Sequence, residues 1–205
     1  MKQILILSFI ASGLLFVSCE KDPDTDKLDN DYLVLTNYDS NTDFSTFDTF
    51  YVIDSILIMG DATKPTYWKN ENSQRIIDAF NDNFVQRGYT EVEGVEEADI
   101  VLQLSYVNTT YYFSGSTAGP WWYNYPGYWN WGGAGWYYPF AFYYSYSTGA
   151  IIGELVDNID VRSDNKLSIV WNTFISGLLS GNNLSYSRTM SAIGQAFTQS
   201  PYLKK

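Results

Sequence analysis

The stretch that decides the fold is "AIIGELVDNIDVRSDNKLSIVWNTFISGLL", residues 150–179. Two runs of alternating apolar and polar residues, 150–161 and 167–179, flank the polar residues 162–166. Alternation with a period of two is typical of a strand with one buried face, and polar residues between two such runs favour a turn. The stretch therefore predicts an antiparallel β-hairpin, with apolar residues on one face of its second strand: Leu167, Ile169, Trp171 and Ile175. We expect Trp171 in the hydrophobic core.

Asp157 shares a face with Leu155 and Ile159 in the first run, whereas Glu154 lies on the opposite face. A carboxyl group buried on an apolar face has a raised pKa, which is a feature of functional sites. The alternative is a residue at a strand edge or bulge, within reach of solvent. The sequence leaves both interpretations open.

Two segments repeat their apolar residues at the spacing of a helix. The first, residues 71–89, predicts a helix that begins at Asn72 or Ser73 and stops at Gly88 in a left-handed conformation. Its apolar stripe consists of Ile76, Ile77, Phe80 and Phe84. The second segment, residues 187–201, ends near Pro201, and its stripe consists of Met190, Ile193 and Phe197.

Two upstream segments have the pattern of strands. Residues 45–54 are rich in aromatic and β-branched residues, and residues 96–108 alternate, with Gln103 and Ser105 on the polar side. The apolar side of this second segment consists of Ile100, Leu102, Leu104 and Tyr106. The order of elements predicts an α+β fold, namely a two-layer sandwich with a mainly antiparallel sheet and two helices packed on one face.

In their order and spacing, these segments resemble the DUF4136 family of bacterial lipoproteins. The resemblance rests on "DFSTFDTFYV", the helix ending "QRGY", the strand "ADIVLQLSY", the hairpin and the closing helix ending "SP". It covers about residues 43–203. It implies an exported lipoprotein domain with no established activity, in which a Gly- and Tyr-rich segment often separates the second strand from the hairpin.

An aromatic and glycine-rich insertion, residues 111–148, occupies that position here. No residue from Ile100 to Gly153 is charged, and residues 111–146 hold 18 aromatic residues, including five of the seven tryptophans. Glycine and proline in its middle argue against one continuous strand or helix. We therefore expect an extended hairpin capped by an aromatic-glycine loop.

The insertion has two interpretations. In the first, its aromatic rings cover the sheet face opposite the helices or are disordered, and in either case they have no binding role. Alternatively they form an exposed platform for a glycan, peptidoglycan or another envelope protein, because large exposed apolar patches mark interaction sites. The candidate ligand- or partner-binding residues are Trp121, Trp122, Tyr123, Tyr125, Tyr128, Trp129, Trp131 and Trp136.

The amino-terminal residues resemble the signal of a bacterial lipoprotein. The uncharged residues 4–17 are too short for a comfortable membrane span and are followed by Ser18 and Cys19, the only cysteine. The resemblance implies removal of residues 1–18 and acylation of Cys19, and two or more acyl chains make a stable anchor without a membrane span. An ordinary signal peptide with an incidental cysteine is the alternative.

Residues 19–42 begin with an acidic run, residues 20–31, that holds six acidic residues and two lysines. Low hydrophobicity and one-sided charge predict a disordered tether ahead of the folded domain, residues 43–203. An acidic run directly after the lipidated cysteine also resembles the export tag of some outer-membrane lipoproteins. We therefore expect an outer-membrane location, on the periplasmic or the cell-surface face.

Composition excludes several classes of function. The net charge of −11 and the lack of a basic cluster exclude nucleic acid as a partner. The chain has no histidine, which removes Ser-His-Asp and Cys-His catalysis and the usual zinc ligands. We expect no catalytic residues, no metal site and no cofactor, hence no enzyme. The rival is a glycosidase that uses two carboxyl groups.

Overall fold

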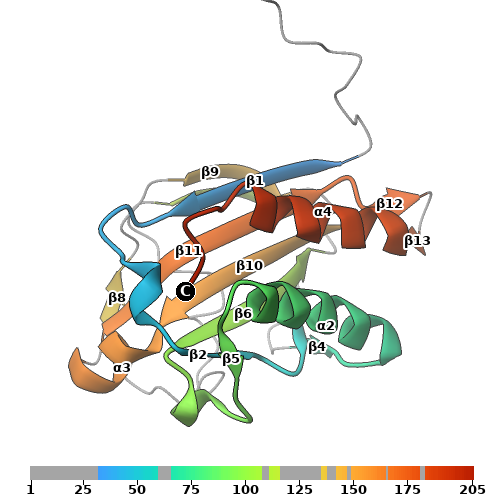
Figure 1. The fold of residues 1–205 in the computed structure, drawn as a ribbon. Coiled ribbons are helices and arrows are strands. Elements are labelled where there is room, and N and C mark those ends of the chain that lie inside the picture. The colour runs from blue at the N-terminus through green and yellow to red at the C-terminus, as the bar shows by residue number, and fades with distance from the viewer. Residues whose placement is uncertain are drawn as a thin grey trace, which may run out of the picture. The chain divides into compact units, whose positions relative to one another are not determined.

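The computed structural model describes residues 32–59, 66–107, 111–115, 135–137, 142–146, 149–164, 166–180 and 183–205. Over these residues the chain forms a large sheet with helices packed against it (Figure 1). The predicted α+β class and two-layer arrangement are confirmed. In this part of the chain, no helix has the length and apolar character needed to span a membrane.

Nine described strands make the large sheet, in the order β1-β11-β10-β6-β2-β5, with β3 paired to β6 and β4, and β8 paired to β11. Pairing is antiparallel among β1, β11, β10 and β6, whereas β2 and β3 run parallel to β6. The strands are β1 Leu33–Tyr38, β2 Thr49–Val52, β3 Ile56–Met59, β4 Thr66–Trp68, β5 Thr90–Glu91, β6 Ile100–Val107, β8 Gly135–Tyr137, β10 Ala150–Asp157 and β11 Lys166–Ser176. Short elements outside it are 3-10 helices at Phe44–Thr46 and Val95–Glu97 and a hairpin of β12 Leu179–Ser180 with β13 Asn183–Leu184.

The hairpin predicted for residues 150–179 is present as β10 and β11, but its connection differs from the prediction. The helix α3, Asn158–Asp164, joins the strands in place of a polar turn. It begins where the Asp157 carboxylate accepts hydrogen bonds from the backbone N–H groups of Ile159, at 2.9 Å, and Asp160, at 3.1 Å. The predicted strand face therefore ends at Asp157, and Ile159 is 40% exposed.

A β-bulge divides the apolar residues of β11 between the two faces of the sheet. Leu155 pairs with Trp171, whereas the next residue, Val156, pairs with Ile169. A bulge places an extra residue in one strand and reverses the side-chain alternation beyond it. Trp171 and Ile175 therefore lie in the core beneath the helices, whereas Leu167 and Ile169 belong to a separate cluster. The prediction that these four residues share one face is wrong for this reason.

The helices α2, Glu71–Gln86, and α4, Tyr186–Thr198, lie on the same face of the sheet (Figure 1). The predicted stripe of α2 is buried, as are Ile193 and Phe197 of α4, while Met190 is partly buried. The N-cap of α2 is Asn70, which lies two residues before Asn72 and three before Ser73, the predicted caps. Its side chain accepts from the N–H groups of Asn72 and Ser73, and the Ser73 hydroxyl accepts from the Asn70 N–H. Gly88 has a φ of 95°, which confirms the left-handed stop.

The guanidinium group of Arg87 joins the end of α2 to the carboxyl-terminal residues. It donates to the carbonyl oxygens of Ser200, at 2.9 Å, Leu203, at 3.2 Å, and Phe197. In return the backbone N–H of Lys205 donates to the Arg87 carbonyl at 3.1 Å. These charge-assisted hydrogen bonds join the end of α2 to the end of α4 and to the residues that follow it.

Residues 33–38, which the sequence placed in the disordered tether, form β1 at the edge of the sheet. β1 pairs antiparallel with β11 along its whole length, from Leu33 with Ser176 to Tyr38 with Trp171. Val34 joins the core beneath the helices. The ordered domain thus begins about ten residues earlier than predicted, and residues 1–31 lie outside the described part of the chain.

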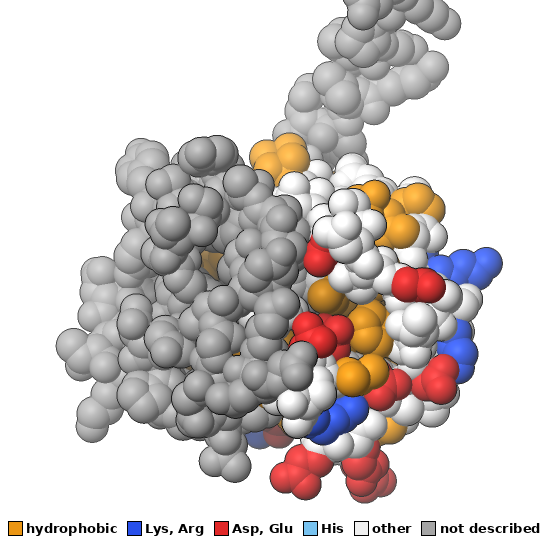
Figure 2. Space-filling view, turned by 90° about the vertical axis from the view of Figure 1, so that its left-hand side faces the viewer, with side chains coloured by type: hydrophobic (Ala, Val, Ile, Leu, Met, Phe, Trp, Pro, Cys, Tyr) orange, Lys and Arg blue, Asp and Glu red, His pale blue; other side chains and the backbone are white. Residues whose placement is uncertain are grey.

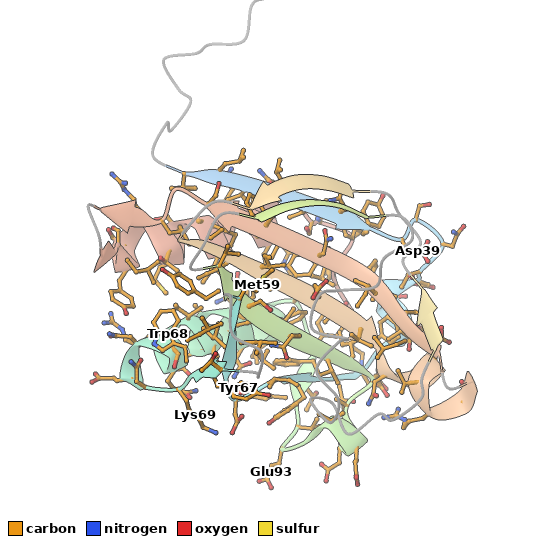
Figure 3. All side chains as sticks on the ribbon, turned by 180° about the vertical axis from the view of Figure 1, so that it is seen from behind. Asp39, Met59, Tyr67, Trp68, Lys69 and Glu93 are labelled. Carbon is orange, nitrogen blue, oxygen red and sulfur yellow. The ribbon has the colours of Figure 1, made fainter. Side chains whose placement is uncertain are left out.

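The strands β7, Tyr111–Gly115, and β9, Phe142–Tyr146, pair antiparallel and confirm the hairpin predicted for the insertion. This hairpin lies on the face of the sheet opposite α2 and α4, as the views from the front and from behind both show (Figures 1 and 3). The strand β8 was not expected, and it pairs parallel with the beginning of β11. The remainder of the insertion lies outside the described residues.

Candidate functional site

A row of four polar side chains crosses the middle of the sheet, one from each of four adjacent strands. Asn37 of β1 pairs with Asn172 of β11, Asn172 pairs with Glu154 of β10, and Glu154 pairs with Gln103 of β6. Residues directly opposite each other on neighbouring strands point to the same face of a sheet. The four side chains, here called the polar row, therefore share one face.

The polar row lies on the face opposite the helices. Leu155 and Leu102, which neighbour Glu154 and Gln103 along their strands, belong to the core with the helix residues. Because successive side chains alternate between faces, the row points the other way. Three of its members are nevertheless buried, with Gln103 0%, Asn172 2% and Glu154 5% exposed, whereas Asn37 is partly buried. Charged and amide side chains are rarely buried to this degree in proteins.

Two apolar clusters border the polar row on this face. One, the Val101 cluster, consists of Leu57, Ala98, Val101, Val156, Val161, Leu167 and Ile169. The other, the Met59 cluster, consists of Met59, Val107, Ala150, Ile152 and Phe174, and Met59 is labelled in the view from behind (Figure 3). On β6, β10 and β11 alike, one cluster lies on each side of the row. The face is therefore apolar at both ends and polar across its middle.

Some buried oxygen atoms on this face of the sheet accept no hydrogen bond from the described part of the chain. The Asn37 amide donates to Asn172 Oδ1 at 3.2 Å, and the Gln103 amide donates to the backbone carbonyl of Leu104. Among the described residues, Gln103 Oε1 and Ser105 Oγ, two positions along the same face of β6, have no hydrogen-bond partner. Each unsatisfied buried group costs about 1–3 kcal/mol. The row therefore presents oxygen atoms suited to N–H or O–H donors.

The polar row consists of three amide side chains and one carboxyl group. Glu154 is its single carboxyl group, so the row lacks the pair of acids that glycoside hydrolysis uses. In the described part of the chain, no three His, Cys, Asp or Glu side chains lie close enough together to hold a metal ion. The row thus places three amide side chains and one carboxyl group within an otherwise apolar face.

The sequence prediction that Gln103 and Ser105 lie on a solvent-exposed face is wrong, because both are buried. The signal that could have revealed this is the presence of Val101 and Val107 on the same side of the strand. Together with the opposite face they make residues 100–107 a nearly continuous apolar run, which is typical of a strand buried on both faces.

Asp157 lies at the end of β10 and has the raised pKa that the sequence suggested. Burial raises its pKa and the Asp160 carboxylate adds to the rise, while hydrogen bonds from the backbone N–H groups of Asp160 and Ile159 oppose it. These hydrogen bonds start α3, so the carboxyl group has a structural role as a helix cap. Asp160 is itself bound by the Ser168 hydroxyl at 3.0 Å.

We expect Asp157→Asn to leave the fold at least as stable at about pH 7, since asparagine caps helices as well as aspartate does. The folded pKa of Asp157 lies above its unfolded value, so the wild-type protein loses stability as the pH rises through the folded pKa. The stability advantage of Asp157→Asn over the wild type should therefore shrink as the pH falls towards 3.8, which is the ordinary pKa of an aspartate. Urea unfolding at several pH values measures this difference in the free energy of unfolding. The Asp157→Ala variant lacks the helix cap, so its free energy of unfolding should be lower by about 1 kcal/mol.

The residues that the sequence singled out as a binding platform fall outside the described side chains. Seven of them lie in residues 116–134, which the structure does not describe: Trp121, Trp122, Tyr123, Tyr125, Tyr128, Trp129 and Trp131. Cys19 lies in residues 1–31, which are also outside the described part of the chain. Trp136 belongs to β8, where its backbone pairs with Leu167.

Comparison with known proteins agrees with this fold. The family described as "Domain of unknown function (DUF4136)" matches residues 34–202. The crystal structure of a DUF4136 family protein from Bacteroides thetaiotaomicron is similar at 40% identity and a TM-score of 0.73, covering 86% of this chain and 99% of that one. A PelC dodecamer from Paraburkholderia phytofirmans matches at 14% identity and a TM-score of 0.41, over 85% of this chain and 98% of that one. No curated protein matches.

Proposed function

The chain belongs to the DUF4136 family, and on that premise we propose that it is an exported lipoprotein, held on the outer membrane through Cys19, whose domain works by contact as a binding or structural component of the cell envelope. The family has no known function, so the proposal is built from this chain's own residues.

The position of Cys19 relative to the fold carries this proposal. β1 begins at Leu33, which is 14 positions after Cys19, and the residues between them are mostly acidic or polar. A chain of this length reaches at most about 50 Å when fully extended. A lipid at Cys19 would therefore hold the domain close to the membrane and leave its surfaces free to meet other envelope components.

The charge of the domain limits which components those are. The chain carries a net charge of −11, and in the coloured part of Figure 2 acidic and basic side chains are interspersed without a basic cluster. Anionic headgroups and nucleic acid are therefore poor ligands. The uncharged insertion, with its tryptophans and tyrosines, suits targets of low charge, either a glycan such as peptidoglycan or an apolar surface of another envelope protein.

Replacing Trp121, Trp122, Trp129 and Trp131 together with alanine tests the contact function. We expect the variant to lose retention on insoluble peptidoglycan or recovery of a co-purifying envelope protein, because large aromatic side chains dominate such contacts. Tyr67→Ala is the matched control, since Tyr67 is an exposed aromatic residue of β4, outside the insertion. A variant that keeps both properties at the wild-type level would overturn the binding role of the insertion. Loss of the first property indicates a glycan, and loss of the second a protein.

The carboxylate-dependent glycosidase is the weaker alternative. It would need two carboxyl groups either about 5–5.5 Å or about 6.5–9.5 Å apart beside a bound sugar. Among the described residues, Asp157 is an acidic residue with a raised pKa, but both of its described hydrogen bonds come from backbone N–H groups of α3. Its role as the cap of α3 explains the position of the Asp157 carboxyl group, so no catalytic role is needed to explain it.

A further inference from the structure

The edge strand β1 presents an open row of backbone groups. It ends the path of the large sheet, and among the described residues β11 is the strand that it pairs with. The Asp39 N–H donates to the Val170 carbonyl at 2.9 Å, which continues the β1–β11 register by one position. In an antiparallel pair the residues that exchange hydrogen bonds alternate with those that do not. The odd-numbered residues of β1 therefore face β11, and Val34, Thr36 and Tyr38 direct their N–H and C=O groups outward.

This edge lacks the features that usually prevent strand pairing. Natural edge strands are protected by charged residues, proline, bulges or very short length. β1 reads "LVLTNY", with no charge and no proline over six residues, and its pairing to β11 has no bulge. Three of the six large hydrophobic residues that are exposed in the described part of the chain lie on it: Leu33 at 50%, Leu35 at 38% and Tyr38 at 40%.

We propose that β1 is a dimerisation edge, at which β1 of a second copy of this chain pairs antiparallel across a two-fold axis through Thr36. Because the outward backbone groups belong to even-numbered residues, Thr36 pairs with the partner's Thr36 and Val34 with the partner's Tyr38. The join makes one continuous sheet from two copies.

The acidic residues beside β1 select this register. With Thr36 on the axis, Asp39 lies opposite the partner's Leu33. If the two-fold axis passed through Leu35 instead, Asp39 would lie opposite the partner's Asp31. Like charges directly opposite each other on paired strands are destabilising, so this register is disfavoured. A register with the axis through Asn37 avoids this charge conflict, but it leaves residues at the beginning of β1 without a partner residue. Asp39 is labelled at the end of β1 in Figure 3.

The dimer is compatible with a membrane anchor on each copy, a point that rests on the proposed lipidation of Cys19. In an antiparallel pair of six-residue strands the two Leu33 residues lie about 20 Å apart, at about 3.4 Å per residue. A two-fold axis normal to the membrane then brings both tethers to the same surface. Anchoring also confines the copies to two dimensions, which raises their effective concentration.

The molar mass of the full chain, extracted in detergent and corrected for bound detergent, tests the proposal without reference to the anchor. We expect the mass of two chains for the wild type and of one chain for Leu35→Lys, because a lysine on the open edge opposes strand pairing. Val85→Lys is the matched control: Val85 is 52% exposed on α2, away from β1, and this variant should keep the mass of two chains. A wild-type protein with the mass of one chain would overturn the proposal, and so would a dimer that Leu35→Lys leaves intact.

A cysteine at the two-fold axis gives a second test that does not depend on a disruptive substitution. The Cα atoms of a hydrogen-bonded antiparallel pair lie about 5.5 Å apart, which is within the range of a disulfide. Mild oxidation in native membranes should therefore convert Thr36→Cys to a covalent dimer, whereas Thr66→Cys, on the edge strand β4, and the parent chain should stay monomeric under denaturing electrophoresis. Equal cross-linking of Thr36→Cys and Thr66→Cys would contradict a specific β1 pairing.

Discussion

Trp171→Ala is expected to lower the free energy of unfolding by about 3–5 kcal/mol, which is the usual loss when a buried aromatic side chain is removed from a core. Trp171 is 0% exposed and lies on β11 beneath the helices, with its ring centroid 5.8 Å from that of Phe197 of α4. Its indole N–H donates to the Ser200 hydroxyl at 2.9 Å. The substitution therefore leaves a cavity between the sheet and α4 and removes a hydrogen bond to the carboxyl-terminal residues.

Urea unfolding of the purified chain measures this loss, and two further variants separate its causes. Trp171→Phe keeps most of the ring and removes the indole N–H, so we expect a loss of about 1–2 kcal/mol. Tyr67→Ala changes an exposed aromatic side chain and should shift stability by no more than about 0.5 kcal/mol. If Trp171→Ala unfolds at the same urea concentration as Tyr67→Ala, the placement of α4 over β11 is incorrect.

The parts of the fold that follow local periodicity could be predicted from the sequence. The three- and four-residue steps of Ile76, Ile77, Phe80 and Phe84 define one buried stripe, and α2 has that stripe. The alternation in residues 150–179 likewise defines the central hairpin. In both cases the pattern lies within 30 consecutive residues.

Elements that depend on distant partners could not be predicted in this way. The helix α3 is held by the Asn158 side-chain amide, which donates to the carbonyl oxygens of Val95 and Ala98, about 60 residues earlier in the chain. β1 follows an acidic run, and its partner β11 lies more than 130 residues away. Without that partner the short "LVLTNY" run is indistinguishable from an apolar interruption of a tether.

The polar row was missed for a related reason. Its members come from four strands and are separated in sequence by up to 135 positions, so no local pattern joins Asn37, Gln103, Glu154 and Asn172. Gln103, Glu154 and Asn172 appear in the sequence as isolated polar residues in predicted strands, and Asn37 lies in the predicted tether. The register of the sheet brings them together.

Cys19→Ala is expected to reduce incorporation of a labelled fatty acid into the protein to background, which is the largest effect predicted for any single substitution. Cys19 is the only cysteine, so no other thiol can accept a thioether-linked lipid. Each buried methylene group contributes about 0.8 kcal/mol to membrane attachment, so loss of the acyl chains removes the stable anchor. Ser18→Ala, which keeps a small residue before Cys19, is the matched control and should be labelled like the wild type.

The intact mass of the mature protein, isolated from membranes, tests the central claim most directly. The account predicts a polypeptide that begins at Cys19 and carries the additional mass of acyl chains on that residue. A mature chain that begins at another residue, or that begins at Cys19 with a free thiol and a free amino group, would contradict the lipoprotein assignment.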